Sequence, residues 1–145
     1  MSRFVVSARS TGAGSATLPA MSLYAAATQG FKLREVAVFN STATGAAMQL
    51  VRLTTTGTVG AALTEGEFDE AFGPAPLCTG VNTHTVGPTL GQVLYTFPVG
   101  AAIGAGMILT FYDDPIVCQV GTANGIGVIT TGTGQIVDVT FIWDE

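Results

Sequence analysis

The sole histidine and the two cysteines are the side chains with nucleophilic chemistry to offer. His84 lies in the run Asn-Thr-His-Thr, six residues after Cys78. A thiol becomes a strong nucleophile when a base lies within hydrogen-bond reach and a third group orients that base. Nothing local supplies the sharp turn or the orienting group. We therefore expect a hydrogen-bonded strand histidine, free buried thiols at Cys78 and Cys118, and no catalytic residue.

Acidic side chains gather at two places where a cation could bind. Four of them fall between positions 65 and 70, and Asp113-Asp114 precedes Pro115. The first group lacks the Asx ligands and the closing glutamate of an EF-hand loop, which favours a solvated loop. The second has the composition of a turn. We predict no metal ion at either place.

Phosphate and sugar recognition have little support. The glycine clusters contain no G-x-G-x-x-G run, and the only lysine, Lys32, lies outside them. A stacking platform for sugars or bases would have to be built from Tyr24, Tyr95 or Tyr112. The sequence therefore predicts no cofactor, and a protein that is not an enzyme.

Charge is scarce and unevenly distributed. Charged residues make up 10% of the chain, whereas about 25% is usual in soluble domains. Positions 1–52 hold all five basic residues and one acid (+4), and the remainder holds nine acids (−9), which sums to −5. An acidic chain is a poor ligand for nucleic acid. The basic part balances the acidic part within a subunit, contacts another subunit, or binds an acidic partner.

The last stretch, Gln135–Trp143, carries the strongest strand signal. Its side chains alternate between an apolar set and a mixed set, so that one face should point into a core. The apolar set is Val137, Val139, Phe141 and Trp143; the mixed set is Ile136, Asp138, Thr140 and Ile142. Gly125–Thr130 precedes it across a loop of hairpin length, which predicts a terminal antiparallel hairpin.

Short strand-like runs between glycine-rich turns predict one all-β domain over residues 1–145. We expect eight strands: Arg3–Arg9, Phe31–Asn40, Met48–Thr55, Thr83–Val86, Gln92–Val99, Met107–Tyr112, Gly125–Thr130 and Gln135–Trp143. Single helical turns are expected in Met21–Thr28 and Glu65–Phe72, and a β-bulge near Arg34-Glu35. This pattern favours an antiparallel β-sandwich of jelly-roll type. An immunoglobulin-like sandwich is the alternative, although its core tryptophan lies mid-chain and Trp143 does not.

The segment Val93–Tyr112 has 20 residues and no charge, enough to span a membrane as a helix. Pro98 and several glycines interrupt it and no basic residue flanks it, which argues against a span. It predicts a hairpin of Gln92–Val99 and Met107–Tyr112. Because both faces of these strands are apolar, we expect cover from a second sheet and from a neighbouring subunit, and hence a homo-oligomer.

Several turn and strand motifs carry a resemblance to a known group. They are Ala62-Leu63-Thr64, the run Val81–Thr89 (VNTHTVGPT), Ala123–Gly127 (ANGIG) and a final β run that ends in acids. Over its C-terminal two-thirds the chain resembles small virion proteins of tailed bacteriophages. The resemblance implies a head decoration (cement) protein: a jelly-roll trimer on the capsid exterior that clamps the major capsid protein. It carries over no functional residue.

We therefore predict a structural virion protein, made in the host cytoplasm because no secretory signal opens the chain. Arg3 and Arg9 begin and end the first strand on one face, about 20 Å apart, and are the predicted contacts to an acidic capsid surface. The alternative is a lectin-like binding module of a tail or fibre. A hydrolase would require a pocket that joins His84 to an acid and a nucleophile.

Overall fold

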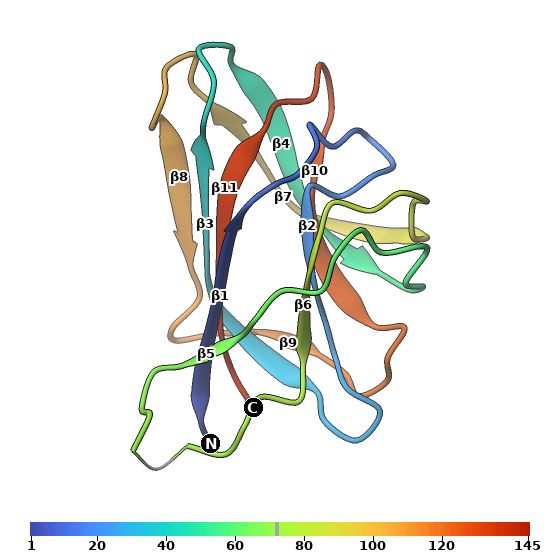
Figure 1. Ribbon diagram of the computed structural model, residues 1–145, viewed down its shortest axis with the longest axis vertical. Helices are drawn as coiled ribbons and strands as arrows, with labels where there is room; N and C mark the ends of the chain where they lie inside the picture. Colours follow the sequence, from blue (N-terminus) through green and yellow to red (C-terminus); the bar gives the residue numbers. More distant parts are fainter. Residues whose placement is uncertain (72) are drawn as a thin grey trace.

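The computed structural model describes residues 1–71 and 73–145, and there the chain forms two antiparallel sheets packed face to face (Figure 1). Sheet A has the order β5-β1-β11-β3-β8, with β9 also paired to β3; sheet B has the order β6-β2-β10-β4-β7. The strands are β1 (Arg3–Arg9), β2 (Met21–Tyr24), β3 (Phe31–Asn40), β4 (Ala46–Leu53), β5 (Gly66–Glu67), β6 (Thr79–Asn82), β7 (Leu90–Val99), β8 (Gly106–Thr110), β9 (Ile116–Cys118), β10 (Gly125–Thr130) and β11 (Val137–Asp144). The described residues contain no helix.

Strand pairing follows the jelly-roll scheme. Antiparallel pairs are nested from the ends of the chain inward: β1 with β11, β2 with β10, β3 with β8, and β4 with β7. Such nesting results when one long antiparallel ribbon rolls up, so that its successive segments fall in opposite sheets. The predicted all-β sandwich of jelly-roll type is confirmed. Three short strands, β5, β6 and β9, extend the eight-stranded framework.

Both predicted hairpins are wrong. β10 belongs to sheet B and β11 to sheet A, and in the same way β7 and β8 lie in different sheets. Each connection therefore crosses from one sheet to the other, over the roughly 10 Å that separate packed sheets. A short polar or glycine-rich loop between two strands can turn within a sheet or cross between sheets, and the residues flanking it do not distinguish the two.

The segment Met21–Thr28 also differs from its prediction. It begins with β2, whose four residues are all buried, rather than with a helical turn. Ala25-Ala26-Ala27 favours a helix by only about 0.5 kcal/mol per residue over typical strand formers. Burying Met21 and Leu23 in the core stabilises the strand by more than this difference.

Two other segments were assigned incorrectly. The strand expected at Thr83–Val86 is instead β6, which ends at Asn82. Where a helical turn was expected at Glu65–Phe72, the chain forms β5, paired with β1; Phe72 itself lies outside the described residues. The predicted bulge is confirmed: Ile142 opposes Glu35 and Trp143 opposes Leu33, so that Arg34 is the extra residue of β3.

β11 lies at the centre of sheet A, between β1 and β3, and its apolar face completes the core. Val137, Val139, Phe141 and Trp143 are all fully buried, as predicted. The Trp143 ring packs against Phe4 of β1, with 5.9 Å between ring centroids. Side chains of a strand alternate between its two faces. Because one face of β11 points into the core, the opposite face points away from it.

The outer face of sheet B has its own apolar cluster. It consists of Tyr24, Val51, Leu53, Val81 and Ile129, each at most 4% exposed. Loops of the same chain cover it: Tyr24 donates to the carbonyls of Thr55 and Thr56, and the loops meet at the Thr58–Val86 bridge. Around this cluster, the outer face of sheet B is therefore covered within one subunit.

Candidate interaction surface

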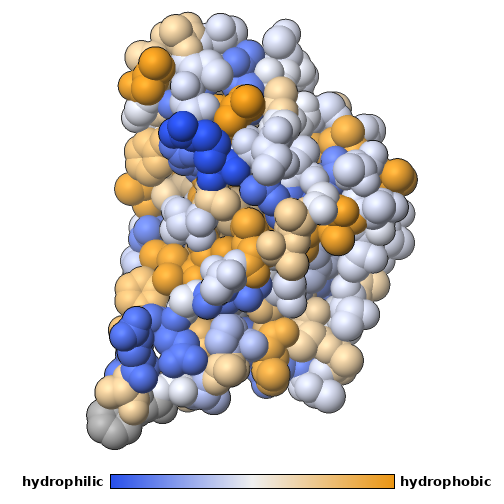
Figure 2. Space-filling model, in the orientation of Figure 1, coloured by the Kyte–Doolittle hydropathy of each residue, from blue (hydrophilic) through white to orange (hydrophobic). Residues whose placement is uncertain are grey.

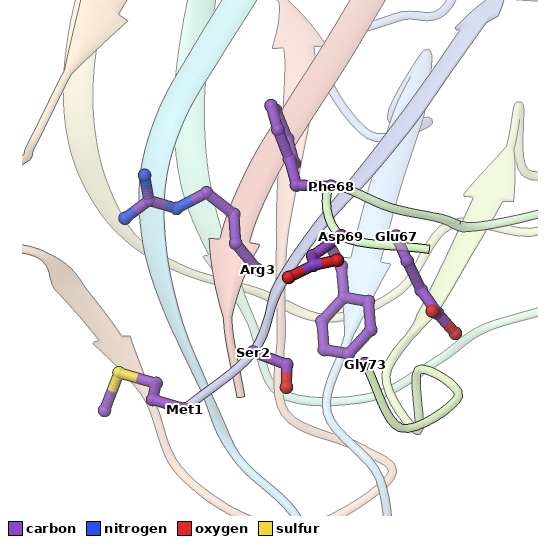
Figure 3. A pocket seen from close by; sticks show the side chains of 8 residues that line it. Met1, Ser2, Arg3, Glu67, Phe68, Asp69 and Gly73 are labelled. Carbon is purple, nitrogen blue, oxygen red and sulfur yellow. The ribbon is translucent and has the colours of Figure 1, made fainter. Parts of the chain in front are cut away.

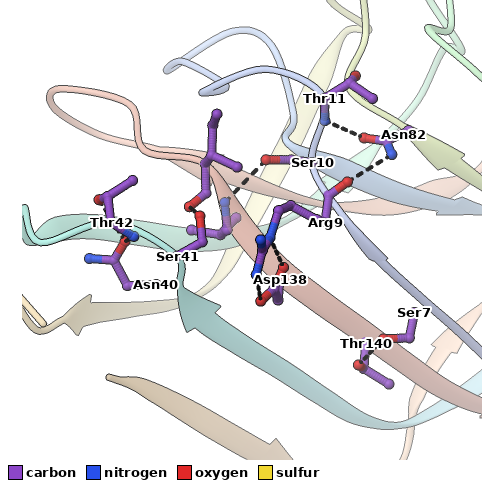
Figure 4. Close-up of polar contacts among 12 residues, drawn as sticks. Ser7, Arg9, Ser10, Thr11, Asn40, Ser41, Thr42, Asn82, Asp138 and Thr140 are labelled. Atoms are coloured by element: carbon purple, nitrogen blue, oxygen red, sulfur yellow. Dashed lines mark hydrogen bonds and ion pairs between the residues drawn. The ribbon is translucent and has the colours of Figure 1, made fainter. Parts of the chain in front are cut away.

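The outer face of sheet A carries paired charges at both ends of β1. At one end, Arg9 binds both carboxylate oxygens of Asp138, at 2.7 and 2.9 Å (Figure 4). At the other end, Arg3 and Arg34 both donate to Asp144, through their Nε atoms at 2.8 and 2.6 Å. These charges lie directly opposite one another in the β1–β11 register, which places each pair on the same face.

These pairs shift the titration of both aspartates. Burial alone would raise the pKa of Asp144, but the hydrogen bonds from Arg3 and Arg34 outweigh it and hold the pKa below its ordinary value. The hydrogen bond from Arg9 likewise lowers the pKa of Asp138. Both carboxylates are therefore ionised at neutral pH and hold their arginines in fixed positions.

Arg3 and Arg9 lie on one solvent-facing side of β1, as predicted. Their side chains are 42% and 65% exposed, so a partner can still reach them. Asn82 fixes the main chain at this end of β1: its amide donates to the Arg9 carbonyl, and its Oδ1 accepts from the Thr11 amide (Figure 4). Both arginines are thus paired with aspartates of the same chain. Their contact with a partner stays a prediction.

Apolar and small polar side chains occupy the rows between the two charged ends. Figure 2 shows hydrophobic residues between two hydrophilic regions on this side of the molecule. Val5 lies opposite Ile142, and in the next row Ser7 shares a 2.7 Å hydrogen bond with Thr140. At the far end of that row lies Ile108 of β8, 53% exposed. This row thus ends at an exposed apolar side chain on β8.

Exposed apolar side chains gather where β7 and β8 are the last strands of their sheets. We call this the β7–β8 surface; it comprises Val93, Tyr95, Ile103, Ile108 and Tyr112, each at least 45% exposed. No charged residue occurs from Ala71 to Tyr112. This is the segment in which two apolar faces predicted a neighbouring subunit.

A shallow hollow lies at one end of the β7–β8 surface. It has a volume of about 370 Å³ and is lined by Tyr95 and residues 110–114, which include Asp113 and Asp114. The Tyr95 ring packs against Phe111 at 5.3 Å, and the Tyr112 hydroxyl donates to Glu35. The hollow joins two of the three tyrosines considered for a stacking platform; the third, Tyr24, is buried elsewhere.

A second hollow, of about 260 Å³, lies beside the N-terminus between β1 and β5 (Figure 3). Its lining includes Arg3, Glu67, Phe68 and Asp69. Figure 3 shows the Arg3 side chain directed away from Glu67 and Asp69, in keeping with its pairing to Asp144. The acidic loop and the arginine therefore do not form one binding site.

His84 forms a pair with a serine that the sequence did not suggest. Its Nε2 lies 3.0 Å from the Ser22 hydroxyl and 3.4 Å from the Tyr24 hydroxyl. Ser22 is fully buried and His84 is 2% exposed, so no substrate reaches this pair. Burial lowers the pKa of His84, and in the described part of the chain no side chain bonds to its Nδ1, so no acidic group orients the ring. The contact is structural.

The sequence analysis does not predict Ser22 as the partner of His84, because it predicts a helical turn at Met21–Thr28. In a strand, Ser22 and Tyr24 share one face and meet His84 together. The predicted hydrogen-bonded histidine is confirmed, although it lies just beyond β6 rather than in a strand.

Both thiols are free and buried, as predicted. Cys78 lies 3.8 Å from the Gln29 carbonyl rather than at His84. Burial raises the pKa of Cys78 to about 12 and that of Cys118 to about 11. Both groups therefore stay protonated at neutral pH and are poor nucleophiles.

The acidic groups have local roles where the structure gives them a partner. Glu65 accepts from the Gly80 amide at 2.6 Å, and Asp69 accepts from the Ala71 amide. In residues 1–71 and 73–145, no group of three or more histidine, cysteine or acidic side chains could hold a metal ion. Over the same residues, no helix is long and apolar enough to cross a membrane.

Comparison with known proteins adds no identification: no protein-family model, curated protein or solved structure matches this chain. The resemblance to phage decoration proteins therefore stays a prediction. The fold alone does not decide function, since sandwiches of this kind carry many. Function must be argued from the surfaces.

Proposed function

We propose that this protein is a structural subunit of a tailed-bacteriophage virion, a decoration protein that binds the outer surface of the head. One observation carries the proposal: the β7–β8 surface exposes five large apolar side chains within a segment that has no charge. Large apolar side chains that gather on an exposed surface mark a contact with another macromolecule. The jelly-roll sandwich, which the resemblance implies, also supports it.

The two surfaces take different contacts in this proposal. The β7–β8 surface contacts other copies of the chain, three in the assembly that the resemblance implies. The outer face of sheet A meets the major capsid protein, through the exposed fraction of Arg3 and Arg9. An assembly multiplies weak contacts, because each further contact forms at a high effective concentration.

Particle binding tests the proposal. The purified chain is mixed with undecorated heads of the phage whose genome encodes it, and the bound copies are counted after sedimentation and located by electron microscopy. We expect ordered density on the capsid exterior and saturation at a fixed number of copies per head. Absence of bound protein at any concentration would refute a decoration role.

The hollow beside Tyr95 favours a second candidate, a glycan-binding module of a tail or fibre. Aromatic faces beside carboxylates are suited to sugar rings, which present C–H groups to one side and hydroxyl groups to another. Tyr95 and Tyr112 are 45% and 48% exposed, next to Asp113 and Asp114. Binding to host-cell polysaccharide that Tyr95→Ala abolishes would favour this function over decoration.

A further inference from the structure

The open edge of β8 is the least protected part of the sandwich. An edge strand presents unpaired N–H and C=O groups, and natural sheets block them with short strands, bulges, prolines, charges or covering segments. β8 has five residues, no charge and no proline, and it pairs with β3 in an unbroken register.

The other lateral edges are protected within the subunit. In sheet A, β5 has only two residues, and at the two ends of β1 the Arg3 carbonyl accepts from the Phe68 amide and the Arg9 carbonyl from the Asn82 side chain. In sheet B, residues 61–63 cover β6: the Leu63 amide donates to Gly80, and the Asn82 amide donates to Ala61. At the opposite edge of sheet B, β7 contains Pro98 and two register shifts. β9 has three residues, and its Val117 carbonyl accepts from Arg52.

Two hydrogen bonds show which groups of β8 are free. The Ala105 carbonyl accepts from the Asn40 amide, and the Phe111 amide donates to the Arg34 carbonyl, both at 2.7 Å. Residues of an antiparallel strand direct their main-chain groups alternately toward the two sides. The main-chain groups of residues 105, 107, 109 and 111 thus point to β3, and those of Gly106, Ile108 and Thr110 point to the open edge.

We propose that β8 pairs with β8 of a second copy of this chain, antiparallel, about a twofold axis at Ile108. In this register Ile108 opposes Ile108 of the other copy, and Gly106 opposes Thr110. All three free positions then form reciprocal main-chain hydrogen bonds, about six in total. The two sheets A join into one continuous sheet.

Three features favour a second copy as the occupant. The free positions are symmetric about Ile108, so the edge is complementary to itself, as a twofold contact requires. The remaining edges are protected, so another copy has no unlike edge to offer. The chain carries a net charge of −5, but none of that charge lies between Ala71 and Tyr112, so two copies do not repel each other at β8.

The contact deepens the proposed function, on which it rests for treating the β7–β8 surface as a contact between copies. A twofold axis perpendicular to the joined sheet keeps both outer faces on one side. Arg3 and Arg9 of the two copies then face the same way, toward one partner surface.

Sedimentation equilibrium and amide hydrogen exchange test the contact without any capsid, so this proposal and the decoration role can fail separately. Ile108→Lys puts like charges directly opposite each other on the axis. Thr110→Pro removes an amide that points to the open edge, away from β3. We expect each variant to fold and to halve the mass of the assembly. The amides of residues 106, 108 and 110 should be protected in the wild type and lose this protection in Ile108→Lys.

Val86→Lys is the matched control, because Val86 is 58% exposed and lies on the opposite side of the molecule, in a loop over sheet B. It should leave mass and exchange unchanged. An unchanged mass in both β8 variants, or rapid exchange of the three amides in the wild type, would overturn the proposal. Protection that appears only after heads are added would assign the edge to a strand of the capsid protein instead.

Discussion

The two sheets treat their outer faces in opposite ways. On sheet A the outer face is open, and ion pairs join Arg3 and Arg9 of β1 and Arg34 of β3 to two aspartates of β11. On sheet B the outer face is apolar, and loops of the same chain bury it. The loops cover the centre of the outer face of sheet B, and its edge strand β7 exposes apolar side chains, whereas sheet A keeps an accessible outer face and an open edge at β8. Contacts with other molecules should therefore use the outer face of sheet A and the β7–β8 surface.

The largest effect is expected on the inner face of β11. Phe141→Ala removes a fully buried ring from the core and should lower the free energy of unfolding by about 3–5 kcal/mol. Thr140→Ala, on the open outer face, loses only an exposed hydrogen bond to Ser7 and should cost about 1 kcal/mol or less. Urea denaturation measures both. Equal losses would contradict the assignment of the two faces.

Sheet B should show no such contrast between its faces. Ile129→Ala changes its outer face, but Ile129 is 3% exposed under the covering loops. We expect a loss of about 2–4 kcal/mol, close to that of a core residue. Val128→Ala, on the inner face of the same strand, is the comparison. A small loss at Ile129 with a large loss at Val128 would show that the loops do not bury the outer face.

Acid should weaken the cover of sheet B. The folded protein holds His84 neutral with a lowered pKa, whereas the unfolded chain takes up the proton below about pH 6.5. The free energy of unfolding should thus be maintained above pH 6.5 and fall as the pH decreases below it, by at most about 1.4 kcal/mol per pH unit. Denaturation midpoints between pH 5 and 7 measure this slope.

The control for this slope is His84→Gln, which keeps a polar side chain but cannot take up the proton. It should flatten the pH dependence between pH 5 and 7 even if it lowers stability at every pH. Hydrogen bonds from arginines hold the pKa values of Asp138 and Asp144 below their ordinary values, so these two carboxylates stay ionised across this window. An equally steep slope in the variant would show that His84 is not the group responsible.

The contrast between the sheets explains what could be predicted from the sequence. Alternation of Val137, Val139, Phe141 and Trp143 defines a strand and its inner face, because side-chain direction in a strand is a local property. The bulge at Arg34 is visible in the same way, since the apolar pattern changes face. Pairing is not local: β10 and β11 read as a hairpin, yet each finds its partners far along the chain.

The candidate site shows the same limit. Exposed apolar residues in Val93–Tyr112 could be predicted, because a long segment without charge has more apolar side chains than one subunit can bury. The pairing of Arg3 and Arg9 to Asp144 and Asp138 could not, since it depends on the register between the first and last strands. The contact between Ser22 and His84 could not be predicted for a similar reason. It requires Ser22 and Tyr24 to share one face, which they do only if Met21–Tyr24 is a strand.

The smallest effect concerns the arginines of sheet A. Arg3→Ala with Arg9→Ala should fold normally, because Asp144 retains Arg34 and Asp138 is partly exposed. The oligomeric state should also be unchanged, because neither residue belongs to β8 and the Arg3 guanidinium only lies over the ring of Tyr112, 5.8 Å from its centre, beyond the end of that strand. We expect the double variant to occupy fewer sites on heads at low salt, with the deficit shrinking as salt rises, because screening already weakens the wild-type contacts. Occupancy across a salt series measures it.

A comparison of Arg52→Ala with Arg9→Ala separates two effects of positive charge: a specific contact through the outer face of sheet A, and the net charge of the chain. Both remove one positive charge, but Arg52 donates to the Val117 carbonyl and lies outside the β1–β11 ladder. If the outer face of sheet A contacts an acidic capsid surface, Arg9→Ala should reduce occupancy at low salt more than Arg52→Ala does. Equal reductions would assign the effect to net charge alone. Unchanged occupancy in the double variant would mean that Arg3 and Arg9 serve only to hold the aspartates of β11.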